Sequence, residues 1–396
     1  MKSPAFLPVL AAFSLLPWAS RAANPTLLVE AGDFPRERAI VSFSPGDAKV
    51  HFLKDKNGNI LPVQPEQSGK AWFVLPALGK GETATFETLN EGSWLSVPGI
   101  KKDGKKYAFK NASQTLMEFQ AEPGELPRED IKPLYLRGGY LHPIRTLSGK
   151  TVTDDFPPNH IHHRGVWASW TKTEFEGRHP DFWNVGDGKG KVEFVSVDKT
   201  FDGPAFNGLV SKQRYVDLTA PEPKTALNET WEVRAYPPDP KGRFWMFDIT
   251  AVQECATSKP LKLPEYRYGG IGFRGNRAWN GKDNTQFLTS EGETDRIKGQ
   301  GTHARWCDIS GLVDGERAGI TIMCHPENFR APQPMRLHPD EPFFNYAPQE
   351  AGPMEITPGK PYVMRYRFVV HDAAPDKELL ERLWNDYAHP VAAKLQ

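Results

Sequence analysis

Short apolar runs separated by turn residues recur along almost the whole chain. Near the N-terminus they fall at residues 27–29, 39–43, 50–53 and 72–75. Between the last two runs, the sequence Asp-Lys-Asn-Gly-Asn at 55–59 is typical of a hairpin turn, because Asn and Gly tolerate positive φ. This spacing predicts a small β-sandwich over residues 24–100.

The strand pattern continues from residue 101 to the end of the chain. Residues 362–370 alternate between apolar and polar positions, as expected of a sheet with one solvated face. Roughly 290 residues of mostly antiparallel strand predict a large two-sheet β-sandwich over residues 101–396. Residues 376–385 instead have apolar positions at helical spacing before Pro390, which predicts a short C-terminal helix.

The first residues have the pattern of an export signal. Lys2 precedes an apolar run over residues 5–18, and Ser20-Arg21-Ala22 offers small residues for a signal peptidase. We therefore predict a signal peptide over residues 1–23, with an uncleaved anchor as the alternative. The run is too short to span a bilayer, and no later segment is long enough. The expected location is periplasmic or extracellular.

The charge composition argues against two classes of binding partner. The chain has 49 Lys plus Arg and 49 Asp plus Glu, so no net charge attracts nucleic acid or an anionic membrane. We expect neither partner. Of the three cysteines, Cys307 and Cys324 flank an Asp314-Gly315 turn and would lie nearly opposite each other in a hairpin. Either a disulfide or two reduced thiols fits this placement.

The densest polar group of the chain follows a turn at 154–158 and precedes a predicted strand at 166–170. It contains His160, His162 and His163, followed by Arg164. In an extended segment, His160 and His162 point to one side and His163 to the other. Imidazole titrates nearest neutral pH, so these residues are candidates for acid or base chemistry. The structural alternative is that they cap turns and fill a polar core.

A metal site is a minor alternative at the same histidines. An i, i+2 pair such as His160 and His162 can bind a metal, with a third ligand from His325 or a Glu. We assign no metal ligand and expect no cofactor.

A second group lies around the predicted hairpin. Asp308 and His325 are expected at neighbouring strand ends, where the carboxylate would orient the imidazole. Asn328, Arg330 and Arg336 follow, and their side chains can bind carboxylate or sugar oxygens. The structural alternative is a set of loop-fixing ion pairs.

A third group is the segment 266–274, where paired glycines stand beside aromatic residues and Arg274. Such glycines indicate a close backbone approach or a bulge at a sheet end. Glu265, next to this segment, is a possible general base.

Aromatic residues gather around all three groups. An exposed aromatic face can bind the apolar face of a sugar ring. Most of these residues are expected in the core, but two or three lining a cleft would suffice. The residues are Trp167, Trp170, Phe182, Trp183, Trp279, Trp306, Phe343, Phe344 and Tyr346. A Gly-x-Ser-x-Gly elbow, a phosphate loop and a His-Glu-x-x-His motif are all absent from the sequence.

At these residues the chain resembles the PmoA-like family of exported bacterial proteins of unknown function. The matching motifs are Tyr-x-x-Pro at 140–143, His-x-His-His-Arg-Gly-x-Trp at 160–167, Phe-Trp-Asn at 182–184, and the segments 269–274, 306–311 and 325–328. The resemblance covers roughly residues 105–372. Asn159 stands where the family pattern has Asp. The family is similar to the galactose-mutarotase-like sandwiches, in which a histidine acid and a carboxylate base act on a sugar.

This resemblance and the polar groups together predict a carbohydrate-active enzyme with histidine acid/base chemistry on a saccharide or glycoside: hydrolysis, elimination or epimerisation. The predicted catalytic residues are His162, His163, His325 and Asp308. The predicted substrate-binding residues are His160, Arg164, Trp167, Trp183, Arg274, Asn328 and Arg330. The alternatives are a non-catalytic glycan-binding protein and a metal-dependent oxidoreductase built on His160 and His162. The sequence gives no basis for predicting an oligomeric state.

Overall fold

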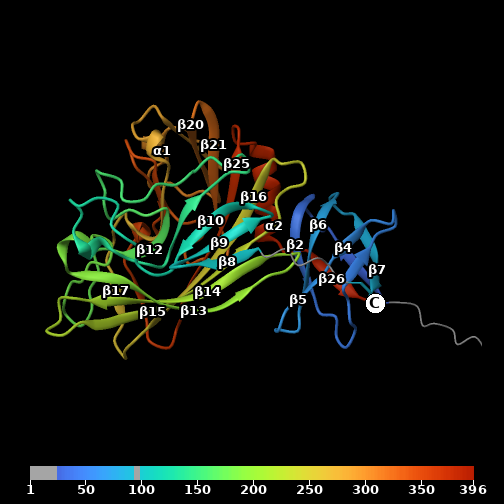
Figure 1. The fold of residues 1–396 in the computed structure, drawn as a ribbon, viewed down its shortest axis with the longest axis horizontal. Coiled ribbons are helices and arrows are strands. Elements are labelled where there is room, and N and C mark those ends of the chain that lie inside the picture. The colour runs from blue at the N-terminus through green and yellow to red at the C-terminus, as the bar shows by residue number, and fades with distance from the viewer. Residues whose placement is uncertain (1–24, 93–98) are drawn as a thin grey trace, which may run out of the picture.

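The computed structural model describes residues 25–92 and 99–396, so the predicted signal peptide lies outside the described residues. The chain folds into a large and a small β-sandwich (Figure 1), which confirms the all-β prediction. Within the described ranges, no helix is both long and apolar enough to cross a membrane.

The large sandwich is built from two antiparallel sheets, each of eight strands in the described part of the chain. In spatial order, sheet 1 contains β22 (Met335–Leu337), β23 (Phe343–Tyr346), β18 (Gly269–Arg274), β12 (Val166–Trp170), β11 (Tyr140–Ile144), β10 (Gln114–Gln120), β9 (Lys106–Asn111) and β8 (Ile100–Asp103). Sheet 2 contains β13 (Gly190–Phe201), β14 (Asn207–Asp217), β15 (Lys224–Ala235), β16 (Phe244–Cys255), β25 (Tyr362–Asp372), β21 (Glu316–Cys324), β20 (Trp306–Val313) and β19 (Thr285–Thr289). A separate pair is formed by β17 (Leu261–Leu263) and β24 (Met354–Ile356).

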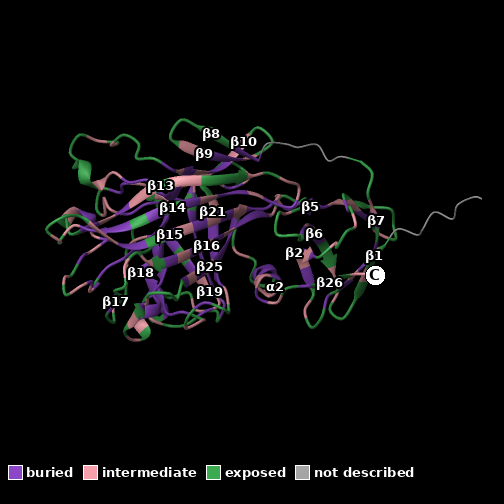
Figure 2. Cartoon of the chain, turned by 90° about the horizontal axis from the view of Figure 1, so that it is seen from below, coloured by how far each residue is buried: buried purple, intermediate pink, exposed green. Residues whose placement is uncertain are grey.

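Strand alternation decides which side chains of sheet 1 reach the site. On β12, Val166, Ala168 and Trp170 belong to the core between the two sheets, whereas Trp167 belongs to a separate aromatic cluster. Successive strand residues point to opposite faces, so Trp167 lies on the outer face of sheet 1. All of β12 is nevertheless buried, and buried strands fill the interior of the large sandwich in Figure 2. Loops must therefore cover the outer face.

The small sandwich has its own apolar core, which includes Leu27, Val41 and Phe73. One sheet contains β26 (Ala392–Leu395), β1 (Thr26–Glu30), β7 (Thr83–Leu89), β3 (Phe52–Lys54) and β4 (Ile60–Pro62), and the other contains β2 (Arg36–Phe43), β6 (Ala71–Leu78) and β5 (Gln64–Pro65). The small domain was predicted from residues 24–100 alone. Strand β26 comes instead from the opposite end of the chain and pairs with β1.

Helix α2 (Lys377–Ala388) confirms the predicted C-terminal helix and lies between the two sandwiches (Figure 1). Asp376 caps its N-terminus by accepting a hydrogen bond from the backbone N–H of Leu379. Its apolar side packs with Met323 on the outer face of sheet 2. On the other side, the Asp386 carboxylate accepts a hydrogen bond from the backbone N–H of Glu37 at 2.8 Å. The helix therefore connects the two sandwiches.

The hairpin of β20 and β21 turns at Asp314-Gly315 as predicted. Its register places Cys307 opposite Ile322, two residues before Cys324. Both thiols are buried and free. Of the two alternatives, the structure therefore has reduced cysteines.

Candidate functional site

The histidine segment is a pair of turns, so the alternation of side chains that an extended segment would give does not apply. The backbone N–H of His160 donates to the Pro157 carbonyl at 3.0 Å, and that of His163 donates to the His160 carbonyl at 2.8 Å. These turns stack His160 on His163, with ring centroids 4.7 Å apart and planes 8° from parallel. The His162 ring meets both of them edge-on.

A fourth imidazole, that of His338, completes what we call the histidine cluster: His160, His162, His163 and His338. Its ring centroid lies 5.8 Å from that of His160. Its Nδ1 accepts hydrogen bonds from the backbone N–H groups of Asp340 and Glu341, at 3.2 and 3.0 Å. His338 was not predicted from the sequence, because it follows β22, far along the chain from the other three histidines.

The cluster lies against a layer of aromatic rings on the outer face of sheet 1. His163 is 3% exposed and stacks on Phe343, with centroids 4.8 Å apart, and its ring lies 5.2 Å from that of Trp167. Trp167 in turn contacts Trp183 at 5.1 Å. Trp167 and Trp183, predicted from sequence, are therefore brought together with the histidines. Tyr140 and Tyr268 complete the layer.

Gly272 leaves the space that the two tryptophan rings of this layer occupy. It lies opposite Trp167 in the register of β12 and β18. A Cβ atom at Gly272 would lie 2.9 Å from the Trp183 ring and 3.1 Å from the Trp167 ring. A side chain at this position would therefore displace a tryptophan.

Arg164 holds the histidine turns in place. Its side chain is fully buried, and it donates to the carbonyls of Ile161 and His163, both at 2.7 Å, and to that of Tyr135. Its guanidinium carbon also lies 3.7 Å from the centroid of the Phe156 ring. These contacts occupy both terminal nitrogens of the group that was predicted to bind substrate, and its Nε forms an ion pair with Asp155 at 3.5 Å, an arrangement that fits a positioning role.

Arg274 stands beside the cluster with part of its guanidinium unpaired. Its Nη2 forms an ion pair with Glu341 at 2.7 Å and donates to the Asn280 side-chain oxygen at 2.6 Å. Its Nε and Nη1 are buried and have no hydrogen-bond partner. The Asn159 amide donates to Glu341 at 2.5 Å. The Glu341 carboxylate therefore links Asn159 to Arg274.

Burial lowers the pKa of every imidazole in the cluster. The pKa of His162 falls to about 4, with His160 and Arg164 adding to the effect of burial. Burial and Arg336 lower the pKa of His338 to about 4. Burial also lowers the pKa of His160, and that of His163 falls well below its usual range. All four rings are therefore neutral at neutral pH.

A neutral imidazole has one donor and one acceptor nitrogen. The Nδ1 atoms of His160 and His163 are buried and have no hydrogen-bond partner. Buried polar atoms are normally paired, so these two nitrogens are exceptions that need an explanation. Together with Arg274, these atoms give the site unused hydrogen-bonding capacity beside aromatic rings.

Arg336 positions one of those rings. Its Nη2 donates to the Tyr268 hydroxyl at 2.7 Å, and its Nη1 donates to the Gln300 side-chain oxygen at 2.8 Å. Tyr268 then lies with its ring centroid 6.3 Å from that of Trp183.

The predicted pair of Asp308 and His325 is wrong. Asp308 Oδ2 contacts His371 Nε2 at 2.7 Å and accepts a hydrogen bond from the Thr321 hydroxyl at 2.7 Å. His325 instead packs edge-on against Tyr387 of α2. The hairpin register explains this difference, because it places Thr321, rather than a residue near the strand end, opposite Asp308.

Asn328 and Arg330 also have structural partners. The Asn328 side chain donates a hydrogen bond to the Arg365 carbonyl and accepts one from the Arg365 backbone N–H, both at 2.8 Å. Arg330 donates to the carbonyls of Pro348, Gly352 and Pro353. None of these contacts reaches the histidine cluster.

The metal alternative depends on how the possible metal-ligating side chains are arranged. His160 and His162 have ring centroids 5.9 Å apart. Among the described residues, no group of three or more His, Cys, Asp or Glu side chains is placed to hold a metal ion.

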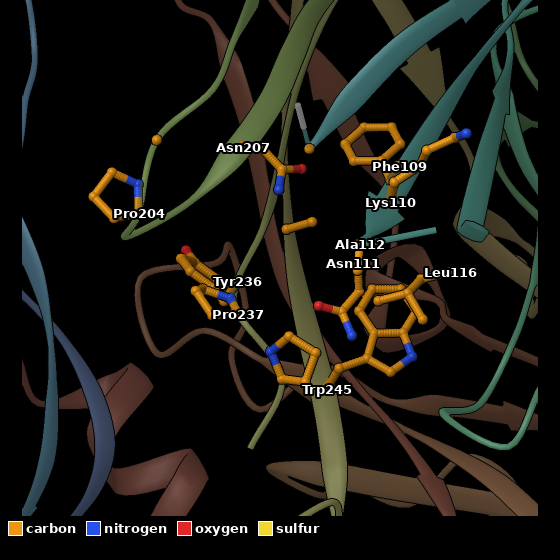
Figure 3. A pocket seen from close by; sticks show the side chains of 14 residues that line it. Phe109, Lys110, Asn111, Ala112, Leu116, Pro204, Asn207, Tyr236, Pro237 and Trp245 are labelled. Carbon is orange, nitrogen blue, oxygen red and sulfur yellow. The ribbon is translucent and has the colours of Figure 1, made fainter. Parts of the chain in front are cut away.

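A separate hollow, shown in Figure 3, has a volume of about 270 Å³ and is lined by residues that include Phe109, Asn207, Tyr236 and Trp245. It shares no residue with the histidine cluster.

Comparison with known proteins gives a family but no activity. No curated protein matches the chain. A solved structure of heparan sulfate lyase HepC from Pedobacter heparinus is similar over 73% of this chain, with 10% identity and a TM-score of 0.33. The match spans 38% of that protein's chain, and this likeness is too low to carry an argument about function. The resemblance to the PmoA-like family stays a prediction. Residues 106–385 match the model of DUF6807, a family of unknown function, and the chain belongs to that family.

Proposed function

We propose that this protein binds a saccharide at the histidine cluster and converts it by base-initiated chemistry. One observation carries the proposal: neutral imidazoles with unpaired buried nitrogens lie directly against the aromatic layer. Aromatic rings suit the apolar faces of a sugar, and a few placed polar groups suit its hydroxyls. Trp167 and Trp183 are 1% and 3% exposed, so Tyr268, which is half-buried, is the accessible ring of the layer.

His162 is the proposed base. A base must be unprotonated at the working pH, and the lowered pKa of His162, about 4, satisfies this condition, while making the ring a weaker base than an imidazole that titrates near neutral pH. His162 is also less enclosed than His163, which stacks between His160 and Phe343. His163 is better suited to hold the cluster together.

Arg274 is the proposed electrostatic partner of His162. Removing a proton from a sugar carbon or hydroxyl leaves negative charge on the substrate, and a fixed positive group stabilises that charge. The charge of Arg274 already contributes to lowering the pKa of His160, His162 and His163, so its field reaches all three rings.

The same pKa values discriminate between reactions. Hydrolysis requires a protonated acid for the leaving group, and the low pKa of these imidazoles disfavours that form at neutral pH. Elimination begins with proton abstraction, and the imidazolium that His162 then becomes can give the proton to the departing oxygen. Epimerisation also begins with proton abstraction, but it needs a proton donor on the opposite face of the carbon. We therefore favour these two reactions over hydrolysis.

The test is incubation of the purified protein with a glycan and glycoside library, read by mass spectrometry and by chromatography, which detects a mass-neutral epimer. We expect a product from the wild type and a loss of turnover of about 100-fold in His162→Gln. His51→Gln, which removes an exposed histidine of the small sandwich, is the control.

Binding of a glycan without any product would favour the alternative of a glycan-binding protein. Full activity of His162→Gln would contradict the assignment of the base. If no library member is bound or converted, the carbohydrate proposal is wrong.

A further inference from the structure

A polar cleft of about 730 Å³ lies next to the aromatic layer. Two loops form it, one after β12 and the other before β18. Its lining consists of Thr171, Lys172, Thr173, His179, Pro180, Asp181, Asn184, Asp187, Lys189, Pro264, Glu265 and Tyr266. The histidine cluster contributes no residue to it. The volume is in the range of sites that enclose small organic ligands.

The cleft and the aromatic layer share a wall. The Asp181 carboxylate accepts hydrogen bonds from the backbone N–H groups of Trp183 and Asn184, at 2.9 and 2.8 Å. It also accepts one from the Thr171 hydroxyl, at 2.9 Å. The loop that places Trp183 in the layer is therefore the loop that forms one side of the cleft.

Aromatic rings run from the histidine cluster to the cleft. The Trp183 ring lies 6.3 Å from Tyr268, and the Tyr268 ring lies 5.8 Å from Tyr266, a lining residue. The ammonium of Lys172 stands 5.5 Å from the Tyr266 ring centroid. Lys172 has a φ of 54°, in the left-handed region that few residues other than glycine adopt. An unusual backbone conformation thus places this lysine beside the ring.

The charges of the lining are mixed. Lys172 and Lys189 are accompanied by the carboxylates of Asp181, Asp187 and Glu265. Two threonines, Thr171 and Thr173, and Asn184 also line the cleft. This mixture favours a ligand with many hydroxyl groups over one with a strong charge of either sign.

We propose that this cleft is a second subsite, which binds further sugar units of an oligosaccharide whose reacting unit lies at the histidine cluster. This inference rests on the proposed function and specifies its substrate class as chains of several sugars. Tyr266 is the proposed platform of the subsite, and the rings of Tyr268 and Trp183 lie along the path between the two sites.

The test measures binding of β-1,4-linked cello-, xylo-, manno- and galacto-oligosaccharides of one to six units, by calorimetry. For the wild type we expect affinity that rises with chain length in at least one series. In Tyr266→Ala we expect a loss of about tenfold for chains of four to six units and of less than twofold for one or two units. Tyr266→Phe should retain the affinity, because it retains the ring.

Phe329→Ala, which removes an aromatic side chain that is 46% exposed and lies outside the cleft, is the matched control. Thermal melting of each variant checks that it is folded. Equal losses for short and long chains in Tyr266→Ala would overturn the subsite. Conversion or binding of short saccharides with no higher affinity for longer chains would also overturn the subsite. That outcome would leave the proposed function intact. If no saccharide of any length is bound or converted, both proposals are wrong.

Discussion

His163 and His162 are neighbours in sequence but have different surroundings. His163 has ring contacts on several sides, with His160, Trp167 and Phe343 among them. The ring contacts of His162 in the structure are with other imidazoles. These surroundings assign a packing role to His163 and leave the chemical role to His162. The sequence alone does not distinguish the two residues.

The glycine beneath the tryptophans gives a residue-scale prediction. In Gly272→Ala the new methyl group would collide with the rings of Trp167 and Trp183. Overpacking of this kind costs about 1–3 kcal/mol of stability. We expect that loss in urea unfolding, together with at least tenfold weaker saccharide binding. Gly124→Ala is the matched control, because no atom lies within 4 Å of a Cβ at that position. Unchanged binding in Gly272→Ala would show that the tryptophans do not contact the saccharide.

The buried pair of Asp308 and His371 gives a second prediction. The carboxylate raises the pKa of His371 against the opposing effect of burial. Removing one partner of a buried ion pair leaves the other uncompensated, so Asp308→Asn should reduce the free energy of unfolding by about 3 kcal/mol. Asp314→Asn, in the turn of the same hairpin, should be nearly neutral. A small loss in Asp308→Asn, measured in urea at pH 6, would mean that His371 is uncharged.

The incorrect pairing of Asp308 with His325 shows which contacts could not be predicted from the sequence. The turn at Asp314-Gly315 was identified, and it fixes which residues of β21 oppose those of β20. The neighbour on the other side of β21 is β25, whose register pairs His371 with Gly319. Nothing local specifies that register, because the two strands are distant in sequence. His338 was missed for the same reason.

Elements were predicted best where apolar positions recur with a clear period, although residues 366–371 of β25 are buried on both faces rather than on the one face that the alternation predicted. The alternating run at 362–370 lies within β25, and the helical pattern at 376–385 lies within α2, apart from its N-cap at Asp376. Strand β26 was not predicted, because it is a short edge strand whose residues alternate between exposed and half-buried. The hydrophobic signal of such a strand is weak, and its partner β1 lies at the other end of the chain.

Strand β26 therefore carries a prediction at the element scale. Deleting residues 391–396 removes this strand and the buried side chain of Val391, leaving the edge of β1 unpaired. The loss of Val391 alone should cost about 2 kcal/mol. We expect a lower unfolding temperature and faster proteolysis within residues 25–92. Lys394→Ala is the control, because it keeps the backbone pairing and changes an exposed side chain. Unaltered proteolysis after the deletion would show that β26 contributes little to the small sandwich.

At the scale of the whole molecule, the two sandwiches are joined by buried polar contacts. The Gln64 side-chain oxygen, in the small sandwich, accepts hydrogen bonds from the backbone N–H groups of Ala205 and Phe206, at 3.0 and 2.9 Å. Arg36 donates to the His389 carbonyl at the end of α2 at 2.7 Å. None of these contacts involves a residue of the histidine cluster, so they join the two sandwiches without taking part in the proposed site.

The histidine cluster also makes the stability of the whole protein depend on pH. An imidazole whose pKa is lowered by folding binds a proton more readily in the unfolded chain. Its contribution to stability is therefore complete above the unfolded pKa of 6.5 and is lost as the pH falls toward the folded value, about 4 for His162 and His338. The raised pKa of His371 has the opposite sign, with stability lost as the pH rises above 6.5.

We therefore expect His162 to contribute a fall of about 2 kcal/mol in the free energy of unfolding between pH 7 and pH 5, whereas Glu229 and Asp386, whose pKa values burial raises to about 7, act in the opposite direction over this interval. Urea unfolding at the two pH values measures it. In His162→Gln this share should disappear, so the variant should lose less stability than the wild type over the same interval. His51→Gln should lose as much as the wild type. An identical pH dependence in the wild type and His162→Gln would mean that His162 keeps its ordinary pKa in the folded protein, and the case for a neutral base at this position would then fail.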